Sequence, residues 1–236
     1  MRAHLPANET ARLQALAAYH LLDSGAERMF DDLTQLASHI CQCPTALIVL
    51  VDKDRQWFKS RVGMEARETP RDFAFCAHAL LQPDMLVVPD ATLDRRFSDN
   101  PLVTGNPYIR FYAGAKLTDP AGFDLGTLCV IDRKPRELTA AQAAALERLA
   151  RQATALAEFR RVARSLSDAL ERVRVMEGLL AICANCKSIR DDAGAWRQLE
   201  EYIEEHSTTN FTHGVCPDCQ GKLYPGFTHA PMSAGK

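Results

Sequence analysis

The residues in this sequence best suited to chemistry are two pairs of cysteines near the carboxyl end. Cys183 and Cys186 stand in the stretch "AICANCKSIR", and Cys216 and Cys219 stand in "HGVCPDCQGK". Each Cys-x-x-Cys pair can present two sulfur atoms on one turn of chain. Two such pairs complete a tetrahedron around Zn²⁺, with Zn–S distances of about 2.3 Å. We therefore expect these four cysteines to bind zinc.

The segment that carries the pairs, residues 181–225, is too small to form a large hydrophobic core. Its clearest pattern is one helical stretch, "AWRQLEEYIEEH", between the two pairs. Binding of a metal would supply folding free energy that burial cannot. We expect a structural, zinc-ribbon-like module with four cysteine ligands that contacts another protein, and residues 226–236 are expected to form a flexible tail.

Three other readings of the cysteine pairs stay open. Iron can occupy a site of four sulfur atoms with similar spacing, although Lys187 and Gln220 stand where a rubredoxin-type site usually has glycine. Oxidation of the thiolates would release zinc, which would make the module a thiol-based redox sensor. Zinc modules also bind DNA, but residues 181–225 carry more acidic than basic side chains, so we expect no nucleic-acid partner.

The composition of the whole chain places it among cytoplasmic proteins. Its 236 residues include 47% hydrophobic residues, and its formal net charge is −2. There is no apolar run of the roughly 20 residues that a membrane span needs, and no apolar signal core stands near the start. In a reducing compartment the cysteines stay as thiols, which favours metal binding over disulfides.

In the first part of the chain, the spacing of hydrophobic residues is first typical of helices and then typical of strands. Helical patterns cover residues 8–22 and the segment that follows Ser24, with Asn8 and a Ser24–Glu27 capping box as expected helix starts. Strand patterns follow at the stretches "TALIVLVD", "QWFKSRVG", "MLVVPD", "YIRFYAGAKL" and "LGTLCVID". Hairpin turns between them predict an α+β fold with an antiparallel sheet.

A long helical pattern begins after Leu138, with Thr139 as its expected cap. Apolar residues recur with a spacing close to 3.5, as a coiled coil requires, at Leu149, Leu156, Phe159, Ala163, Leu166, Leu170, Val173 and Leu180. The first part of this helix is expected to pack on its own domain. The rest has too little chain left to cover it, so we expect a homodimer through residues 139–180.

Six stretches of the first part, read in order, resemble a GAF domain of the kind that precedes bacterial histidine kinases and diguanylate cyclases. They are "FDDLTQLASHIC", "ALIVLVDKDRQWFKSRVGM", "TPRDFAFCAHAL", "LVVPDATLDRRFSDNPLV", "IRFYAGAKL" and "GTLCVIDRKPRELT". The resemblance implies an antiparallel sheet of about six strands, with helices on one face and a ligand pocket on the other. It also implies a role in signal transduction. The expected organisation is a GAF domain at 1–137, a signalling helix at 138–180 and the zinc module at 181–225.

The resemblance does not fix a ligand, so candidate pocket residues come from the sequence itself. Cys76 and His78 lie in "FCAH", and Arg110 and Tyr112 share one face of an alternating strand that could meet an anionic ligand. The alternative is a purely structural role, with these side chains packed in the core or exposed to solvent. Similar domains include free methionine-(R)-sulfoxide reductases, for which Cys76 and Cys129 would be candidate thiols, but the surrounding motifs are those of sensors. We therefore expect a sensor rather than an enzyme.

Overall fold

The structure is a computed structural model that describes residues 2–174, 181–191, 193–207 and 209–225. The chain divides into two compact units, residues 1–166 and residues 167–236. The first unit contains a six-stranded sheet with helices on its faces, and the second contains short helices and a small hairpin. The expected α+β class is thereby confirmed for the first unit.

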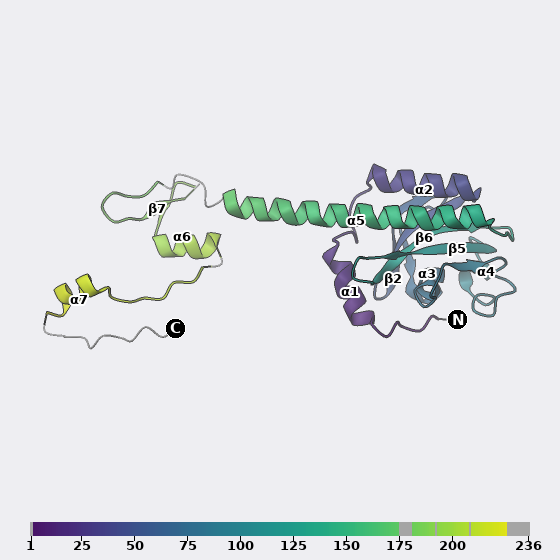
Figure 1. Cartoon of the computed structure of the whole chain (residues 1–236), viewed down its shortest axis with the longest axis horizontal. Helices are drawn as coiled ribbons and strands as arrows, with labels where there is room; N and C mark the ends of the chain where they lie inside the picture. The colour runs from purple at the N-terminus through teal and green to yellow at the C-terminus, as the bar shows by residue number, and fades with distance from the viewer. Residues whose placement is uncertain (1, 175–180, 192, 208, 226–236) are drawn as a thin grey trace. The chain divides into compact units, whose positions relative to one another are not determined.

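The sheet is antiparallel throughout, with strand order β3-β2-β1-β6-β5-β4 (Figure 1). Its strands run over β1 (Thr45–Val51), β2 (Arg55–Val62), β3 (Glu68–Pro70), β4 (Leu86–Val88), β5 (Phe111–Thr118) and β6 (Asp124–Asp132). The central pair, β1 and β6, is buried along nearly its whole length. A strand that is apolar on both faces needs cover on both, and each face of this sheet has its own core.

Three helices cover one face of the sheet: α1 (Glu9–Ala18), α2 (Arg28–Cys41) and α5 (Ala140–Arg174). Figure 1 shows α2 and α5 over the sheet, and the Gln142 side-chain amide of α5 donates to the Ile40 carbonyl of α2 at 3.1 Å. The core on this face includes Leu16, Phe30 and Leu146, each at most 1% exposed. Burial of these apolar side chains is the main stabilising contribution on this side.

Shorter elements cover the opposite face. They are η1 (Arg71–Phe73), α3 (Phe75–Ala79) and α4 (Pro101–Thr104), joined by turns. Here Phe75 stacks on Phe97 with ring centroids 4.0 Å apart, and both rings lie in a second core with Val49. Because short elements and turns leave gaps where regular helices would not, this is the face on which a cavity can form.

The helix starts agree only in part with the expected caps. The Gln142 amide donates to the Thr139 hydroxyl, which confirms Thr139 as the cap of α5, and the Gln142 side chain accepts from the Thr139 amide in return. The Asn8 side chain makes no capping hydrogen bond. The Ser24–Glu27 box is wrong, because Glu27 itself is the N-cap of α2 and the Ser24 hydroxyl donates to the Leu21 carbonyl. Both side chains instead accept a hydrogen bond from the buried ammonium group of Lys59.

A buried ion network ties the start of α1 to the sheet. The Glu9 carboxylate accepts from Arg12 at 2.8 Å and from Arg71 at 2.5 Å. Both guanidinium groups are almost fully buried, and Arg71 also donates to the Asp52 carbonyl at 2.8 Å. These hydrogen bonds outweigh the effect of burial, which alone would raise the pKa of Glu9, and lower that pKa to about 2.

Helix α5 is 35 residues long and changes character along its length. Up to Ala157 it buries one side chain per turn, through Leu146, Ala150 and Ala153, against the sheet. Between Ala157 and Glu171 its large apolar side chains are exposed, including Phe159 at 70%. Packing of the first part on its own domain is confirmed. The expected continuation through residues 175–180 lies outside the described residues, and no helix among those described is long and apolar enough to cross a bilayer.

The second unit contains a two-stranded sheet and two short helices. Strands β7 (Ile189–Arg190) and β8 (Trp196–Arg197) pair antiparallel, and helices α6 (Leu199–His206) and α7 (Pro217–Leu223) follow. Its buried side chains are few, and Ile189 and Tyr202 are the large apolar ones among the residues that the structure describes. The expected tail at 226–236 lies outside the described residues.

Candidate functional site

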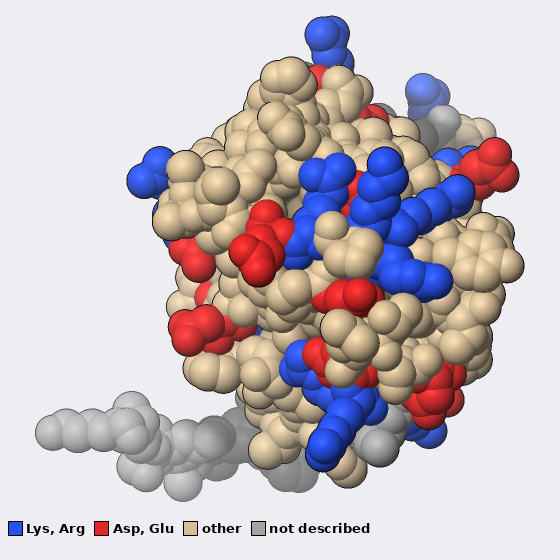
Figure 2. All heavy atoms as spheres, turned by 90° about the vertical axis from the view of Figure 1, so that its right-hand side faces the viewer, with Lys and Arg blue, Asp and Glu red and all other residues tan. Residues whose placement is uncertain are grey.

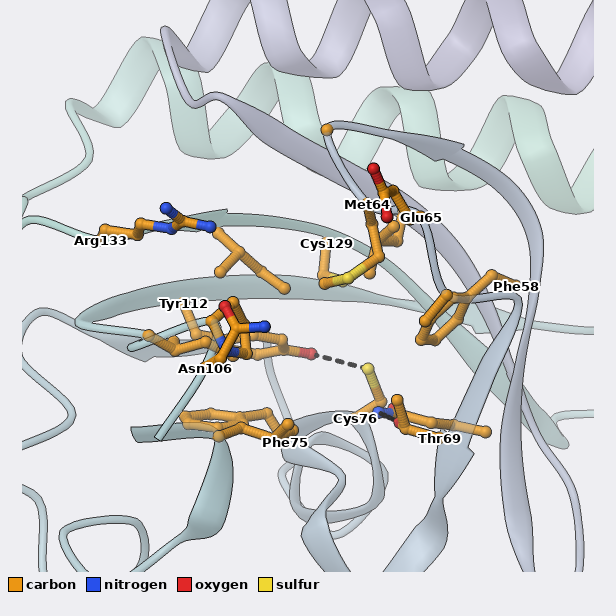
Figure 3. A pocket seen from close by; sticks show the side chains of 18 residues that line it. Phe58, Met64, Glu65, Thr69, Phe75, Cys76, Asn106, Tyr112, Cys129 and Arg133 are labelled. Carbon is orange, nitrogen blue, oxygen red and sulfur yellow. Dashed lines mark hydrogen bonds between the residues drawn. The ribbon is translucent and has the colours of Figure 1, made fainter. Parts of the chain in front are cut away.

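A cavity of about 540 Å³ lies on the face of the sheet opposite α2 and α5 (Figure 3). Its walls come from the strands β1, β2, β3, β5 and β6, the helices α3 and α4, and the turns around them. Most of the lining is apolar, with Phe58, Phe75 and Ile131 among the contributors. A volume of this size is typical of pockets that enclose small organic ligands.

Two thiols and a phenol form one polar cluster in the wall of the cavity. The Tyr112 hydroxyl donates to the Cys76 sulfur at 3.4 Å, as the dashed line in Figure 3 shows. The Cys129 side chain lines the same cavity. All three side chains line the cavity while being at most 3% exposed to bulk solvent.

The position of Tyr112 depends on a glycine two residues further along β5. Side chains at positions 112 and 114 share one face of the strand. A Cβ atom added at Gly114 would stand 2.2 Å from the Tyr112 hydroxyl oxygen. The missing side chain therefore leaves the space in which the tyrosine ring lies along the strand and reaches Cys76.

The thiols of the cluster differ in their tendency to ionise. Burial alone would raise the pKa of Cys76, but the neighbouring Cys129 and Tyr112 side chains outweigh burial and lower that pKa. Burial and the interaction with Cys76 hold the pKa of Cys129 well above its usual range.

Gln56 on β2 places an unpartnered polar atom in the cavity wall. Its side-chain nitrogen donates to the Thr69 hydroxyl at 2.6 Å, while its side-chain oxygen is buried without a hydrogen-bond partner among the described residues. The residue is 6% exposed and lines the cavity. A buried acceptor without a partner is costly, so this oxygen suits a ligand that brings an N–H or O–H group.

The mouth of the cavity carries charges of both signs. The exposed residues Glu65, Asn106 and Arg133 lie in its lining, and Figure 3 shows their side chains around the cavity. Arg133 belongs to the connection between β6 and α5, where Lys134 and Arg136 follow. Figure 2, which views the molecule from the end where α5 begins, shows basic side chains gathered near the middle of this face with acidic ones among them.

The structure brings two of the four expected pocket residues to the cavity. Cys76 and Tyr112 line it, whereas His78 and Arg110 are not among its lining residues. The His78 ring packs edge-on against Phe97 at a centroid distance of 4.8 Å. The Arg110 guanidinium donates to the Val103 carbonyl at 2.9 Å. A ligand-binding role for these residues stays a prediction.

The sequence does not predict Gln56 as part of the pocket, whereas it names Cys76 and Cys129 together as candidate thiols, and both line the cavity. One signal was available, since Gln56 and Phe58 stand two apart on a strand and so share a face. A polar side chain beside an aromatic one on a buried face is a weak sign of a pocket.

The first cysteine pair lies on a tight turn stabilised by the backbone. The Lys187 amide donates to the Cys183 carbonyl at 3.0 Å, and the Cys183 amide donates to the Ser188 carbonyl at 2.8 Å. Lys187, directly after the pair, has a left-handed backbone with φ of 64°. The Cys186 thiol donates to the Ser188 hydroxyl at 3.3 Å. Hydrogen bonds from Ser188 and then Cys183 to its thiolate lower the pKa of Cys186 to about 7.

The second pair lies at the start of α7. Cys216 is the N-cap residue of this helix and Cys219 is in its first turn, and hydrogen bonds from Cys219 lower the pKa of Cys216. Each pair thus places two cysteines on one turn of chain, and the pKa of one of them, Cys186 or Cys216, is lowered. Within the described ranges, no three His, Cys, Asp or Glu side chains are gathered as metal ligands. A zinc site that joins both pairs therefore stays a prediction.

Comparison with known proteins identifies the family of the first unit. The family model described as "GAF domain" matches residues 25–156, more than half of the chain. The chain therefore belongs to the GAF family, as the six sequence stretches indicated. The six-stranded antiparallel sheet and the long helix α5 agree with this assignment.

A curated relative and two solved structures show how far the similarity extends. The relative, cyclic di-GMP phosphodiesterase PA2567 of Pseudomonas aeruginosa, is 46% identical over 147 residues, which make up 62% of this chain and 25% of that protein. The chromophore-binding domain of a bacteriophytochrome from R. palustris has a TM-score of 0.50 at 9% identity, covering 69% of this chain and 65% of its own. The GAF domain of an Acinetobacter phosphoenolpyruvate-protein phosphotransferase has a TM-score of 0.48 at 13% identity. The match covers 66% of this chain and 95% of that one.

Proposed function

We propose that this chain is a dimeric signal-transduction regulator in which a GAF domain senses a small molecule. The domain at 1–137 binds the ligand, the helix at 138–180 pairs two chains, and the module at 181–225 binds zinc and contacts a partner protein. The chain acts as a regulator in the cytoplasm and carries no catalytic reaction of its own. Membrane and nucleic acid are not among its partners.

The observation that carries this proposal is the change in helix α5 at Ala157. Before that residue the helix is part of the domain core, through Leu146 and Ala153. After it, Phe159, Leu166 and Leu170 are 70%, 59% and 53% exposed. These large apolar residues follow the 3.5-residue spacing of a coiled coil, so a second copy of the helix is the occupant that fits them. One rigid helix then links the ligand domain to the paired segment.

The ligand that the cavity suits is small and largely apolar, with one hydrogen-bond donor. The apolar walls provide most of its contact area, and the Gln56 oxygen accepts its donor. The relative PA2567 is named as a cyclic di-GMP phosphodiesterase, and this chain spans 25% of its length. That relative supports a signalling role for the domain, and the identity of the ligand is a separate question.

Zinc is the metal that the two cysteine pairs fit best. The turn at Cys183–Cys186 and the helix start at Cys216 each hold two thiols, and thiolate ligands in pairs favour zinc. When bound, the metal supplies structural cross-linking between the pairs. The resulting module is small and acidic, which suits a protein partner.

A thiol-based redox sensor is the second candidate, and one observation favours it. Cys186 is exposed, and its thiol lies 3.3 Å from the Ser188 hydroxyl, whose hydrogen bond lowers the pKa of the thiol. A thiolate is the form that oxidants attack. In this reading the cysteine pairs receive the signal, and oxidation releases zinc and rearranges the paired helices.

Sedimentation of the full chain tests the proposal. Wild-type protein should sediment as two chains, and Leu166→Glu should shift it toward single chains because like charges would face each other in the paired helices. Ser165→Glu is the matched control, since Ser165 is exposed on the same helix but off the apolar stripe. A single-chain wild type, or equal effects of the two variants, would contradict pairing through α5.

A further inference from the structure

The ammonium group of Lys59 is buried among acceptors from the loop between α1 and α2. The side chain is 0% exposed, and its Nζ atom donates to the Glu27 carboxylate at 2.5 Å. It also donates to the Ser24 hydroxyl at 2.8 Å and to the Gly25 carbonyl at 2.7 Å. An ammonium group has three N–H donors, so each of them finds an acceptor. A buried charge needs such partners, and the pairing therefore fastens this loop to strand β2.

The Glu27 carboxylate joins this lysine to helix α5. Its Oε1 atom, which accepts from Lys59, also lies 3.0 Å from the Nε atom of Arg160. The same guanidinium group donates to the His20 carbonyl at 3.0 Å, just after the end of α1. Arg160 lies about one turn beyond Ala157, which still packs in the core beneath the helices. These contacts therefore hold α5 at the place where it leaves the domain.

Lys59 is the extra residue of a β-bulge whose neighbour forms part of the cavity wall. In the pairing of β1 with β2, Phe58 lies opposite Val49. The next paired residue is Ser60, opposite Ile48, so Lys59 has no partner residue on β1. Phe58 lines the cavity, whereas Lys59 and Ser60 both bond to the helical layer. Because a bulge bends the strand locally, a displaced Phe58 ring moves the backbone that carries Lys59.

The two cations that share Glu27 differ in how firmly they are held. Lys59 is fully buried, while the side chains of Arg160 and Glu27 are 26% and 37% exposed. An ion pair that water reaches contributes little on its own, so Arg160 can separate from Glu27 without unfolding of the domain. A small movement of Lys59 and Glu27 is therefore enough to change how often α5 is held at this point.

We propose that Lys59, Glu27 and Arg160 form a latch that holds α5 on the domain, and that displacement of Phe58 by a ligand in the cavity releases it. The inference rests on the proposed sensing role of the cavity. It adds the residues through which the cavity reaches the helix that pairs two chains. All contacts of the latch lie within one chain, so the latch itself does not depend on pairing.

Hydrogen exchange of the full chain, followed by mass spectrometry, tests the latch. Arg160→Met and Glu27→Gln should each make the amides of residues 158–166 exchange about tenfold faster, the effect of losing one charge-assisted hydrogen bond. Arg164→Met is the matched control at an exposed position of the same helix, and it should leave these rates unchanged. All variants are compared in the Leu166→Glu background, where pairing of α5 does not mask its release.

Substitutions in the cavity wall test the link to the cavity. Phe58→Leu is the probe for displacement of the ring, and it should also speed exchange at residues 158–166. Phe75→Leu removes an aromatic ring from the same wall, but Phe75 lies on α3 and not beside the bulge, so it should have no such effect. In a Lys59→Met background the latch is absent, and Phe58→Leu should then add no further increase. Slow exchange of the β1 amides shows that each variant keeps the fold.

Two results would overturn the proposal. The first is equal exchange at residues 158–166 in Arg160→Met and Arg164→Met, which would exclude the latch. The second is an equal effect of Phe58→Leu with and without Lys59, or an equal effect of Phe75→Leu, which would exclude the link to the cavity. If Lys59→Met does not keep the fold, Glu27→Gln serves as the background in its place. Pairing of the chains is decided separately by sedimentation, so a failed latch and a failed sensor dimer give different results.

Discussion

The hydroxyl of Tyr112 donates a hydrogen bond to the sulfur of Cys76 across 3.4 Å, and this contact joins strand β5 to helix α3 in the wall of the cavity. The contact faces the cavity and is shielded from bulk solvent, with Tyr112 at 1% and Cys76 at 3% exposure. It requires the space above Gly114, and it contributes to the lowered pKa of Cys76. The contact therefore fixes two side chains of the cavity wall together.

Gly114→Ala should break this contact. The new Cβ would stand 2.2 Å from the Tyr112 hydroxyl oxygen, so the ring must move away from Cys76. We expect a loss of about 1–3 kcal/mol in unfolding free energy, the usual effect of overpacking a core. Urea unfolding measures it. Gly25→Ala is the control, because no atom lies within 4 Å of a Cβ built there. Equal stability of the two variants would show that Tyr112 does not need this space.

Gln56→Met should leave the stability of the ligand-free protein within about 1 kcal/mol of wild type. The substitution removes the hydrogen bond to Thr69 but also removes a buried oxygen without a partner, and these effects oppose each other. In a thermal-shift screen of small metabolites, compounds that stabilise the wild type should lose their effect on this variant. Gln82→Met, outside the cavity lining, should keep it. Retained stabilisation by Gln56→Met would contradict a role for this oxygen in binding.

Stability should fall in acid as Glu9 is protonated. The pKa of Glu9 in the folded protein, about 2, lies below its ordinary value of 4.5. Its contribution is therefore complete above about pH 4.5 and is lost as the pH falls toward 2. We expect about 2 kcal/mol after allowance for solvent screening. Glu9→Gln should unfold more easily at pH 7 and show a shallower pH dependence between about pH 4.5 and 2.5. Parallel pH profiles for both proteins would refute this role of Glu9.

Lys187→Gly should raise the zinc affinity of the cysteine pairs. Lys187 has φ of 64°, a conformation that costs an ordinary residue about 1 kcal/mol and glycine much less. The gain corresponds to roughly fivefold tighter binding, which competition with a chromogenic chelator measures. Ala184→Gly, in the same turn but without positive φ, should weaken binding slightly through chain entropy. Weaker zinc binding by Lys187→Gly would argue against this turn as half of a metal site.

Much of the sheet followed from sequence patterns alone. The run "TALIVLVD" predicts β1 because seven apolar or β-branched residues in a row need cover on both sides, and β1 lies at the centre of the sheet. The alternation at residues 111–117 also holds, since Phe111, Ala113 and Ala115 face the helices while Tyr112 faces the cavity. Ile109 does not follow this alternation, because the residue lies before the start of β5 and packs on the cavity side of the sheet.

Other features depend on contacts that the sequence does not display. In β2 the register shifts by one residue opposite Ile48 and Val49, so Lys59 and Ser60 both turn toward α2. The alternation of side chains along a regular strand does not predict where such a β-bulge occurs. The presence of Cys76 and Cys129 in the wall of one cavity likewise depends on where α3 packs on β6. His78 was placed near the pocket because of its neighbour Cys76, but one short helix turns the two side chains in different directions.

Native mass spectrometry of the freshly purified full chain tests the central claim most directly. The account predicts a particle of two chains with one zinc ion per chain and, when the sensed molecule is carried through purification, an added small-molecule mass that Gln56→Met loses. A single metal-free chain, with a mass equal to that of the sequence alone, would contradict it.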